Sequence, residues 1–184
     1  MPDPFDLLGR WYDRLFGVPE AGALARLLGV EPGQRVLDLG GGTGRVAQFL
    51  AEMQVVVCDL SAGMAREARR KGLLTCRGRA EALPFGDAAF DAVLVVDAFH
   101  HFAGQQEAAR EMLRVLRPAG RLVLEEPDVR RPAIRLVGLG ERLLGMESHM
   151  LRLEELQDLF QAAGGAAVDR GTAGAAIRLV IVSH

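Results

Sequence analysis

Cysteine is scarce in this 184-residue sequence, which contains two, Cys58 and Cys76. Both lie in apolar runs typical of strands, and neither belongs to a CxxC pair. This pattern excludes a disulfide framework and a cysteine-based metal site, and it predicts two buried thiols. Long apolar runs are missing as well, because no uninterrupted stretch approaches the roughly 20 residues of a membrane-spanning helix.

An excess of charge of one sign is also missing. The net charge is −2, which gives no global attraction for nucleic acid or for an anionic membrane. Charged residues begin at Asp3 and recur at Asp6, Arg10 and Asp13, so the start of the sequence lacks the pattern of a secretory signal. We therefore expect a cytoplasmic protein. The length fits one domain over residues 1–184, and no internal repeat or low-complexity linker divides it.

The sequence does contain a short apolar run that ends in a nearly all-glycine turn, Val36-Leu37-Asp38-Leu39-Gly40-Gly41-Gly42-Thr43-Gly44-Arg45. We interpret this stretch as a strand, a tight loop and the start of a helix. Gly40, Gly42 and Gly44 can adopt positive φ and let the backbone approach a ligand closely. In open α/β sheets, nucleotide-like molecules bind in the crevice between the first strand and the first helix, so a cofactor is expected there.

Two classes of cofactor compete for that crevice. Gly42, Gly44 and Ala47 satisfy the loose dinucleotide pattern G-x-G-x-x-(G/A), which suits an NAD(P)-dependent oxidoreductase. The second strand, Val55–Asp59, ends in a carboxylate that can accept hydrogen bonds from both ribose hydroxyls of either cofactor class. Against the oxidoreductase, the single tyrosine and the single lysine lie far apart, so no Tyr-x-x-x-Lys pair exists.

The glycine loop resembles motif I of the class I S-adenosylmethionine-dependent methyltransferases. The resemblance is carried by Gly40, Gly42 and Gly44, which alternate as G-x-G-x-G, and by the acidic Asp38 two places upstream. It implies that the loop packs against S-adenosyl-L-methionine and that Asp38 reaches toward the methionine end. It also implies an α/β fold with a doubly wound, Rossmann-like sheet in the order 3-2-1-4-5-7-6, the last strand antiparallel, and helices on both faces. A glycine turn that only packs the strand against the helix is the alternative without a ligand.

A second segment, Gly78-Arg79-Ala80-Glu81-Ala82-Leu83-Pro84-Phe85, narrows the resemblance. It is similar to the segment that follows strand three in the ubiquinone/menaquinone-type methyltransferases and passes beside the adenine. The resemblance implies cofactor contacts from Leu60, Arg79 and Ala80, whose backbone amide can serve a ring nitrogen. The family's typical residue at position 79 is Asp, which accepts a hydrogen bond from the adenine amino group. Arg79 has only donors, so it can stack on the purine but cannot accept that bond.

The fourth strand, Phe90–Val96, leads into Asp97-Ala98-Phe99-His100-His101-Phe102. This stretch resembles the family's strand-four exit, where a paired histidine is common and where the methyl acceptor must approach. The resemblance implies that Asp97 contacts the cofactor. If the acceptor must lose a proton, His101 is the first candidate for the general base and His100 the second. Either imidazole could instead only pack at the end of the strand.

Periodicity and turn signals predict further elements on both sides of these motifs. An N-terminal cap is expected over 1–30, with helices at 5–16 and 20–29. A lid is predicted over 127–150. Further helices are expected from Ser61 to Lys71, over 104–116 and over 152–163, and further strands after the turn at Arg117–Gly120, over 166–170 and over 176–182.

We therefore predict an enzyme that transfers the methyl group of S-adenosyl-L-methionine to a small-molecule acceptor. The sulfonium already activates the methyl group, so the protein has mainly to hold the acceptor in line with the S–CH₃ bond. An NAD(P)-dependent oxidoreductase and a non-catalytic S-adenosylmethionine-binding or partner-binding module remain alternatives. No pattern identifies the acceptor or the oligomeric state, and neither nucleic acid nor a metal ion is expected as a partner.

Overall fold

The computed structural model describes residues 21–143 and 148–183. The expected helix at 5–16 lies outside these residues. In chain order the described elements are α2 (Ala21–Leu28), β1 (Arg35–Leu39), the 3-10 helix η1 (Ala47–Phe49), β2 (Gln54–Asp59), α3 (Ala62–Arg70), β3 (Leu74–Arg77), β4 (Phe90–Val96), the 3-10 helix η2 (Phe99–His101), α4 (Gln105–Val115), β5 (Leu116–Pro127), α5 (Pro132–Leu143), α6 (Leu153–Ala162), β6 (Gly165–Ala173) and β7 (Ala176–Ser183).

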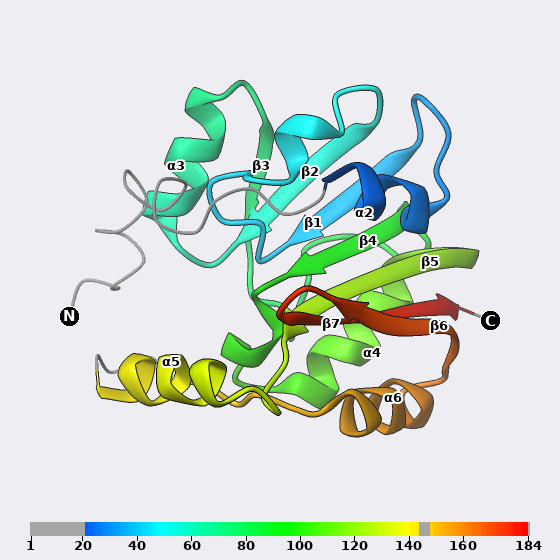
Figure 1. Ribbon diagram of the computed structural model, residues 1–184. Coiled ribbons are helices and arrows are strands. Elements are labelled where there is room, and N and C mark those ends of the chain that lie inside the picture. Colours follow the sequence, from blue (N-terminus) through cyan, green and yellow to red (C-terminus); the bar gives the residue numbers. More distant parts are fainter. Residues whose placement is uncertain (1–20, 144–147, 184) are drawn as a thin grey trace.

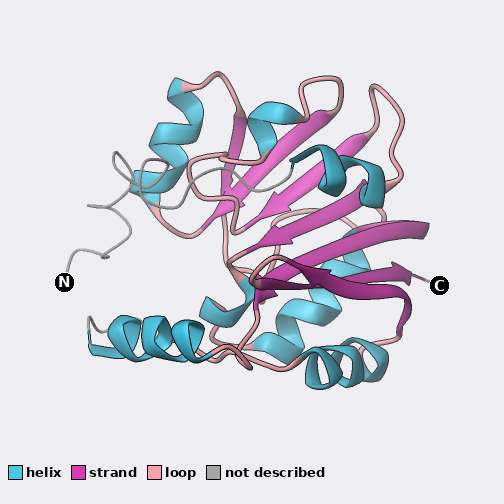
Figure 2. Ribbon diagram, in the orientation of Figure 1, coloured by secondary structure: helices cyan, strands magenta, loops and turns pink. Residues whose placement is uncertain are grey.

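The strands form one seven-stranded sheet in the order β3-β2-β1-β4-β5-β7-β6 (Figure 1). Neighbouring pairs among β1 to β5 are parallel, whereas β7 runs antiparallel to both β5 and β6. The predicted strand order and the antiparallel last strand are therefore confirmed. Helices lie on both sides of the sheet, as Figure 2 shows.

Alternate residues of the central strands face two separate hydrophobic cores. Leu37 and Val93 belong to the core that is closed by α4 and α6, whereas Val36 and Leu94 belong to the core that is closed by α2, η1 and α3. A parallel strand with both faces covered reads as a nearly continuous apolar run, and β4 has this composition. Because β1 pairs in parallel with both β2 and β4, the carboxyl ends of the three strands lie together at one edge of the sheet.

The prediction of a helix that begins directly after the glycine loop is wrong. The chain forms turns after the loop and then only the short 3-10 helix η1. The segment between Gly44 and strand β2, which begins at Gln54, is short. The glycine loop, rather than the first turn of a long helix, therefore lines the crevice.

Other turn signals act as expected. The Ser61 hydroxyl accepts a hydrogen bond from the amide of Met64 at 3.1 Å and so caps α3, and Gly72 follows the helix with φ +81°. The turn predicted at Arg117–Gly120 differs, because the structure includes it in β5 as an irregularity of the ladder in which Ala119 has φ +62°. Within the described ranges, no helix is long and apolar enough to cross a bilayer.

Candidate cofactor site

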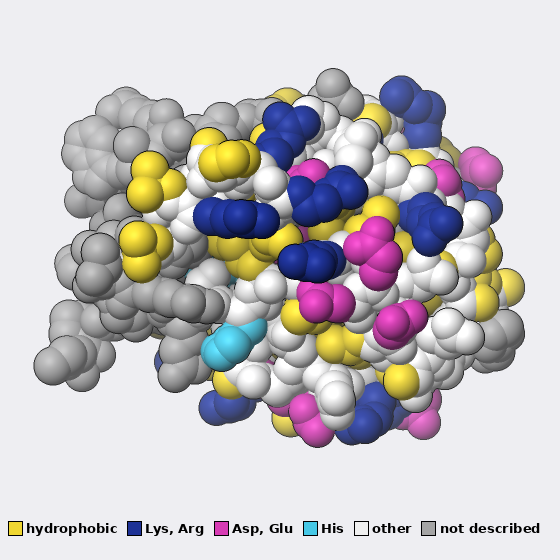
Figure 3. All heavy atoms as spheres, turned by 60° about the horizontal axis from the view of Figure 1, so that its bottom comes forward, with side chains coloured by type: hydrophobic (Ala, Val, Ile, Leu, Met, Phe, Trp, Pro, Cys, Tyr) yellow, Lys and Arg dark blue, Asp and Glu magenta, His cyan; other side chains and the backbone are white. Residues whose placement is uncertain are grey.

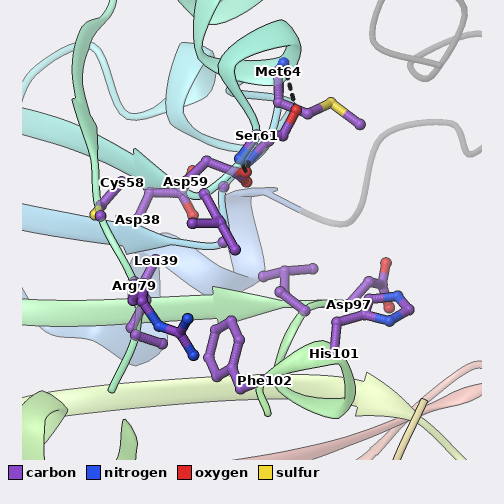
Figure 4. Close-up of a pocket in the computed structure, with 18 of the residues that line it drawn as sticks. Asp38, Leu39, Cys58, Asp59, Ser61, Met64, Arg79, Asp97, His101 and Phe102 are labelled. Carbon is purple, nitrogen blue, oxygen red and sulfur yellow. Dashed lines mark hydrogen bonds between the residues drawn. The ribbon is translucent and has the colours of Figure 1, made fainter. Parts of the chain in front are cut away.

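A cavity of about 300 Å³ opens where β1, β2 and β4 end (Figure 4). Small-molecule sites range from about 300 to 1,000 Å³, so the cavity is large enough for a ligand. Two predicted residues, Gly44 and His100, are described by the structure but do not belong to the lining. The other predicted site residues all line the cavity: Asp38, Gly40, Gly42, Asp59, Leu60, Arg79, Ala80, Asp97 and His101.

Gly40 stands where β1 turns out of the sheet. Its φ is +67°, and its amide donates to the carbonyl of Cys58 at 2.8 Å. A Cβ at this position would lie 2.5 Å from the Cβ of Ala98, closer than real carbon atoms approach. Glycine is therefore needed here because the loop passes between the ends of β2 and β4.

Gly44 serves packing instead of lining the cavity. Its φ is +73°, and an added Cβ would lie 2.1 Å from Cδ1 of Leu73, which follows α3. The close contact between the glycine loop and α3 therefore explains this glycine without a ligand contact.

Asp59 is held in a fixed orientation at the end of β2. Its Oδ2 accepts a hydrogen bond from the amide of Gly42 at 2.9 Å, and its Oδ1 accepts one from the amide of Ser61 at 2.8 Å. A carboxylate oxygen can accept more than one hydrogen bond, so lone pairs remain for a ligand. The same carboxylate therefore ties the glycine loop to the start of α3 and faces the cavity.

Asp38 is the most buried acid of the site, with an exposed fraction of 1 %. Burial raises its pKa from 3.8 to about 7, and the negative charge of Asp59 adds to this rise. The guanidinium of Arg45 and a hydrogen bond from the amide of Ala47 act in the opposite direction. Among the described residues, Oδ2 of Asp38 has no hydrogen-bond partner. A ligand that brings a donor or a positive charge would satisfy this oxygen.

Two residues that line the cavity, Arg45 and Asp97, form an ion pair that sequence reasoning missed. The guanidinium of Arg45 lies 2.8 Å from the carboxylate of Asp97, and only 7 % of the Arg45 side chain is exposed. Asp97 has φ +52°, in the left-handed region that aspartate adopts more readily than most other residues with a side chain, and its amide donates to the carbonyl of Glu125 at 2.9 Å. The ion pair therefore links the glycine loop to the end of β4.

Arg79 lies at the rim of the cavity. Its side chain is 61 % exposed and pairs with Glu81, Nε to Oε2, at 3.4 Å. Glu81 also accepts a hydrogen bond from the amide of Gly104, at the start of α4, at 3.0 Å. The cation is therefore engaged with a neighbouring carboxylate at the place where the family resemblance expects an acceptor for adenine.

The segment after Arg79 is fastened to α4. Glu111 accepts a hydrogen bond from the amide of Leu83 at 2.7 Å, while Arg114 donates to the carbonyls of Leu83 and Phe85 at 3.3 and 2.9 Å. The hydrogen bonds from Arg114 hold the pKa of the Glu111 carboxyl below its usual range. This network keeps the wall of the cavity that contains Ala80 in place.

The two histidines of η2 have different surroundings. His101 lines the cavity, whereas the ring of His100 is buried and its Nδ1 lies 2.5 Å from the carboxylate of Glu126. The two ring centroids are 4.0 Å apart. Of the two candidate bases, only His101 therefore lies where a ligand in this cavity could reach it.

Several lining residues were not predicted: Arg45, Ser61, Met64, Glu81 and Phe102. Glu81 lies in the segment after β3 and Phe102 in the exit of β4, two of the motifs that carry the family resemblance, so the sequence held a signal for them. Arg45 had none, because its role depends on an ion pair with a residue of another strand end. Among the described residues, no three His, Cys, Asp or Glu side chains are grouped so that they could hold a metal ion.

Known proteins with similar sequences are methyltransferases. Residues 37–124 match the family model of a methyltransferase domain. The demethylmenaquinone methyltransferase of Beutenbergia cavernae is 41 % identical over 133 residues, which are 66 % of this chain and 55 % of the relative. The ubiquinone/menaquinone biosynthesis C-methyltransferase UbiE of Serratia proteamaculans is 39 % identical over 111 residues, 53 % of this chain and 44 % of the relative. The chain thus spans about half the length of the curated relatives it matches.

Similarity of fold extends over nearly the whole chain. A solved SAM-dependent methyltransferase from Thermotoga maritima superposes with a TM-score of 0.82 and 25 % identity, over 98 % of each chain. The sequence match covers the motifs on which the resemblance was based: the glycine loop, the segment after β3 and the exit of β4. The chain therefore has the fold and the matched motifs of a class I S-adenosylmethionine-dependent methyltransferase, and its central half is similar in sequence to those of the ubiquinone/menaquinone type.

Proposed function

We propose that the cavity binds S-adenosylmethionine and that the protein transfers its methyl group to a small-molecule acceptor. The observation that carries this proposal is the buried Oδ2 of Asp38, which has no partner among the described residues and belongs to a residue of the cavity wall. The methionine end of the cofactor carries an ammonium group, which is the kind of donor that this oxygen lacks. The donor set of the site therefore fits the cofactor.

Other residues would hold the remaining parts of the cofactor. Gly40 and Gly42 let the loop backbone approach, and Asp59 offers acceptors for the ribose hydroxyls. Leu60, Arg79 and Ala80 would border the adenine. Asp97, paired with Arg45, would contribute to the methionine end, where the guanidinium suits a carboxylate.

The bound cofactor would supply a methyl group that its sulfonium already activates. The chain's own residues then have to hold the acceptor in line and exclude water. Where the acceptor must lose a proton, His101 would take it, because it is the histidine on the cavity wall. His100 is engaged with Glu126 and is not proposed as the base.

The acceptor is proposed to be a quinone-type molecule. The support is the names of the relatives, which refer to demethylmenaquinone and ubiquinone. Among the described residues on the face shown in Figure 3, acidic side chains lie between the basic ones, which does not favour nucleic acid as the acceptor. The cytoplasmic location and the single domain over 1–184 expected from the sequence are part of this proposal.

Helix α5 is proposed as part of the lid over 127–150. It is the first element after β5. Near the other end of the proposed lid, the amide of His149 donates a hydrogen bond to the carbonyl of His100 at 2.7 Å. Leu136 and Leu139 on α5 are 71 % and 54 % exposed, which leaves apolar surface for an acceptor to cover. The cap over 1–30 stays a prediction, since most of it lies outside the described residues.

Calorimetry tests the cofactor and separates the alternatives. The protein should bind S-adenosylhomocysteine and should bind neither NAD nor NADP. The reverse result would refute the methyltransferase proposal in favour of the oxidoreductase. Transfer of labelled methyl to demethylmenaquinone then tests the activity, and binding without turnover on any acceptor would support the non-catalytic module instead.

A further inference from the structure

Glu126, near the carboxyl end of β5, is buried against η2 and has no task in the proposed function so far. Its Oε1 accepts hydrogen bonds from the amides of Ala98 and Phe99 at 2.9 and 2.8 Å. Its Oε2 accepts one from the amide of His100 at 3.3 Å and lies 2.5 Å from Nδ1 of the same residue. The exposed fractions are 4 % for Glu126 and 3 % for His100. A carboxylate this buried needs such donors, because it has lost its contact with water.

The arrangement determines which nitrogen of His100 carries the proton. An ionised carboxylate only accepts hydrogen bonds, so Nδ1 must donate to Oε2. When the ring is neutral, this fixes the Nδ1–H tautomer and makes Nε2 the acceptor. The carboxylate also satisfies backbone amides at the start of η2, which have no partner within so short a helix.

The carbonyl groups of η2 are held as well. The carbonyl of His100 accepts a hydrogen bond from the amide of His149 at 2.7 Å. The side-chain amide of Gln105 donates to the carbonyls of Phe99 and His149 at 3.1 and 2.9 Å. The backbone of η2 is therefore fixed at its amides by Glu126 and at its carbonyls by Gln105 and by His149, near the end of the proposed lid.

We propose that Glu126 and His100 are positioning residues that hold His101 toward the acceptor. The ring of His101 lies 4.0 Å, centroid to centroid, from the ring of His100, and both rings belong to the same short helix. Any rotation of His100 or shift of η2 would therefore move His101. This inference rests on the proposed function, in which His101 faces the acceptor, but the state of His100 can be measured without turnover.

Nuclear magnetic resonance of the ring nitrogens in the 184-residue protein tests the first half of the proposal. We expect Nδ1 of His100 to carry a proton in the native protein, because it faces the carboxylate of Glu126. In Glu126→Gln, the carboxamide oxygen should stay with the amides of Ala98 and Phe99, so the NH₂ group faces Nδ1 and must donate to it. His100 should then switch to the Nε2–H tautomer.

Glu125→Gln is the matched control. Glu125 precedes Glu126 on β5 and is also buried, but its carboxylate pairs with Arg178 of β7. The substitution Glu125→Gln makes the same chemical change in the same strand. This variant should therefore reproduce any general loss of stability and leave the tautomer of His100 unchanged. A native Nε2–H tautomer, or an identical response of His100 to both variants, would overturn the proposal.

Kinetics test the second half. Glu126→Gln and His100→Phe should lower kcat for methyl transfer about tenfold or more, while the affinity for S-adenosylhomocysteine changes less than about twofold. If Glu126→Gln does not fold, His100→Phe and the native tautomer decide. Native turnover in both variants would overturn the positioning role. A native protein that does not bind S-adenosylhomocysteine would instead refute the proposed function, and the resonance measurement separates these two failures.

Discussion

Asp38→Asn should make the protein more stable and its cofactor binding weaker. Burial raises the pKa of Asp38 from 3.8 to about 7. The folded protein therefore keeps this proton up to about pH 7, whereas the unfolded chain releases it near pH 4. Between these values the unfolded state binds fewer protons, so the contribution of Asp38 to the free energy of unfolding falls as the pH rises.

The size of the effect follows from the shift. About three pKa units at roughly 1.4 kcal/mol each give a cost of up to about 4 kcal/mol at pH 8. Asparagine is neutral at every pH and avoids this cost, and its oxygen can still accept the hydrogen bond from Ala47. The free energy of unfolding of the variant should therefore exceed that of the native protein by up to about 4 kcal/mol at pH 8, which corresponds to a Tm higher by roughly 8–16 °C for a chain of this size. Near pH 4 the two should be nearly equal.

Urea unfolding of both proteins at several values between pH 4.5 and pH 8 measures this difference. All other titratable groups are shared, so the growth of the difference with pH isolates Asp38. Calorimetry with S-adenosylhomocysteine should show the opposite effect of the substitution on binding. The affinity of the native protein should rise toward pH 7 as the carboxylate ionises to meet the ammonium group, whereas the variant should bind weakly at every pH. A stability difference that is the same at pH 5 and pH 8 would refute the reasoning.

Three further variants test other parts of the site. Asp59→Ala removes the acceptor for the ribose hydroxyls and should weaken S-adenosylhomocysteine binding by roughly 2–3 kcal/mol in calorimetry; unchanged affinity would show that the ribose lies elsewhere. Arg79→Asp supplies an acceptor for the adenine amino group, and because the native guanidinium is largely exposed and engaged with Glu81, binding should tighten by about 0.5–1.5 kcal/mol. Weaker binding would mean that the native guanidinium stacks on the purine. His101→Ala should lower methyl transfer about 100-fold with cofactor affinity retained; full turnover of the variant would exclude His101 as the base.

The sequence alone was sufficient for the strands and turns that build the site. β2 and β4 were predicted nearly to the residue, because strands covered on both faces are continuous apolar runs. The cap at Ser61 and the stop at Gly72 follow from side-chain and backbone chemistry within a few residues. Asp38 and Asp59 could be placed at one edge of the sheet for the same reason, since parallel strands bring their carboxyl ends together.

The tertiary structure decided how those residues are paired and charged. The bond between Arg45 and Asp97 joins two loops, and the bond between His100 and Glu126 joins η2 to β5, so neither leaves a pattern in the local sequence. The pKa of Asp38 likewise depends on burial by segments far apart in the chain. Local sequence thus determined which side chains reach the edge of the sheet. Packing across the sheet determined which of them are buried, which are engaged with each other and which face the ligand, because those properties depend on distances between segments that only folding sets.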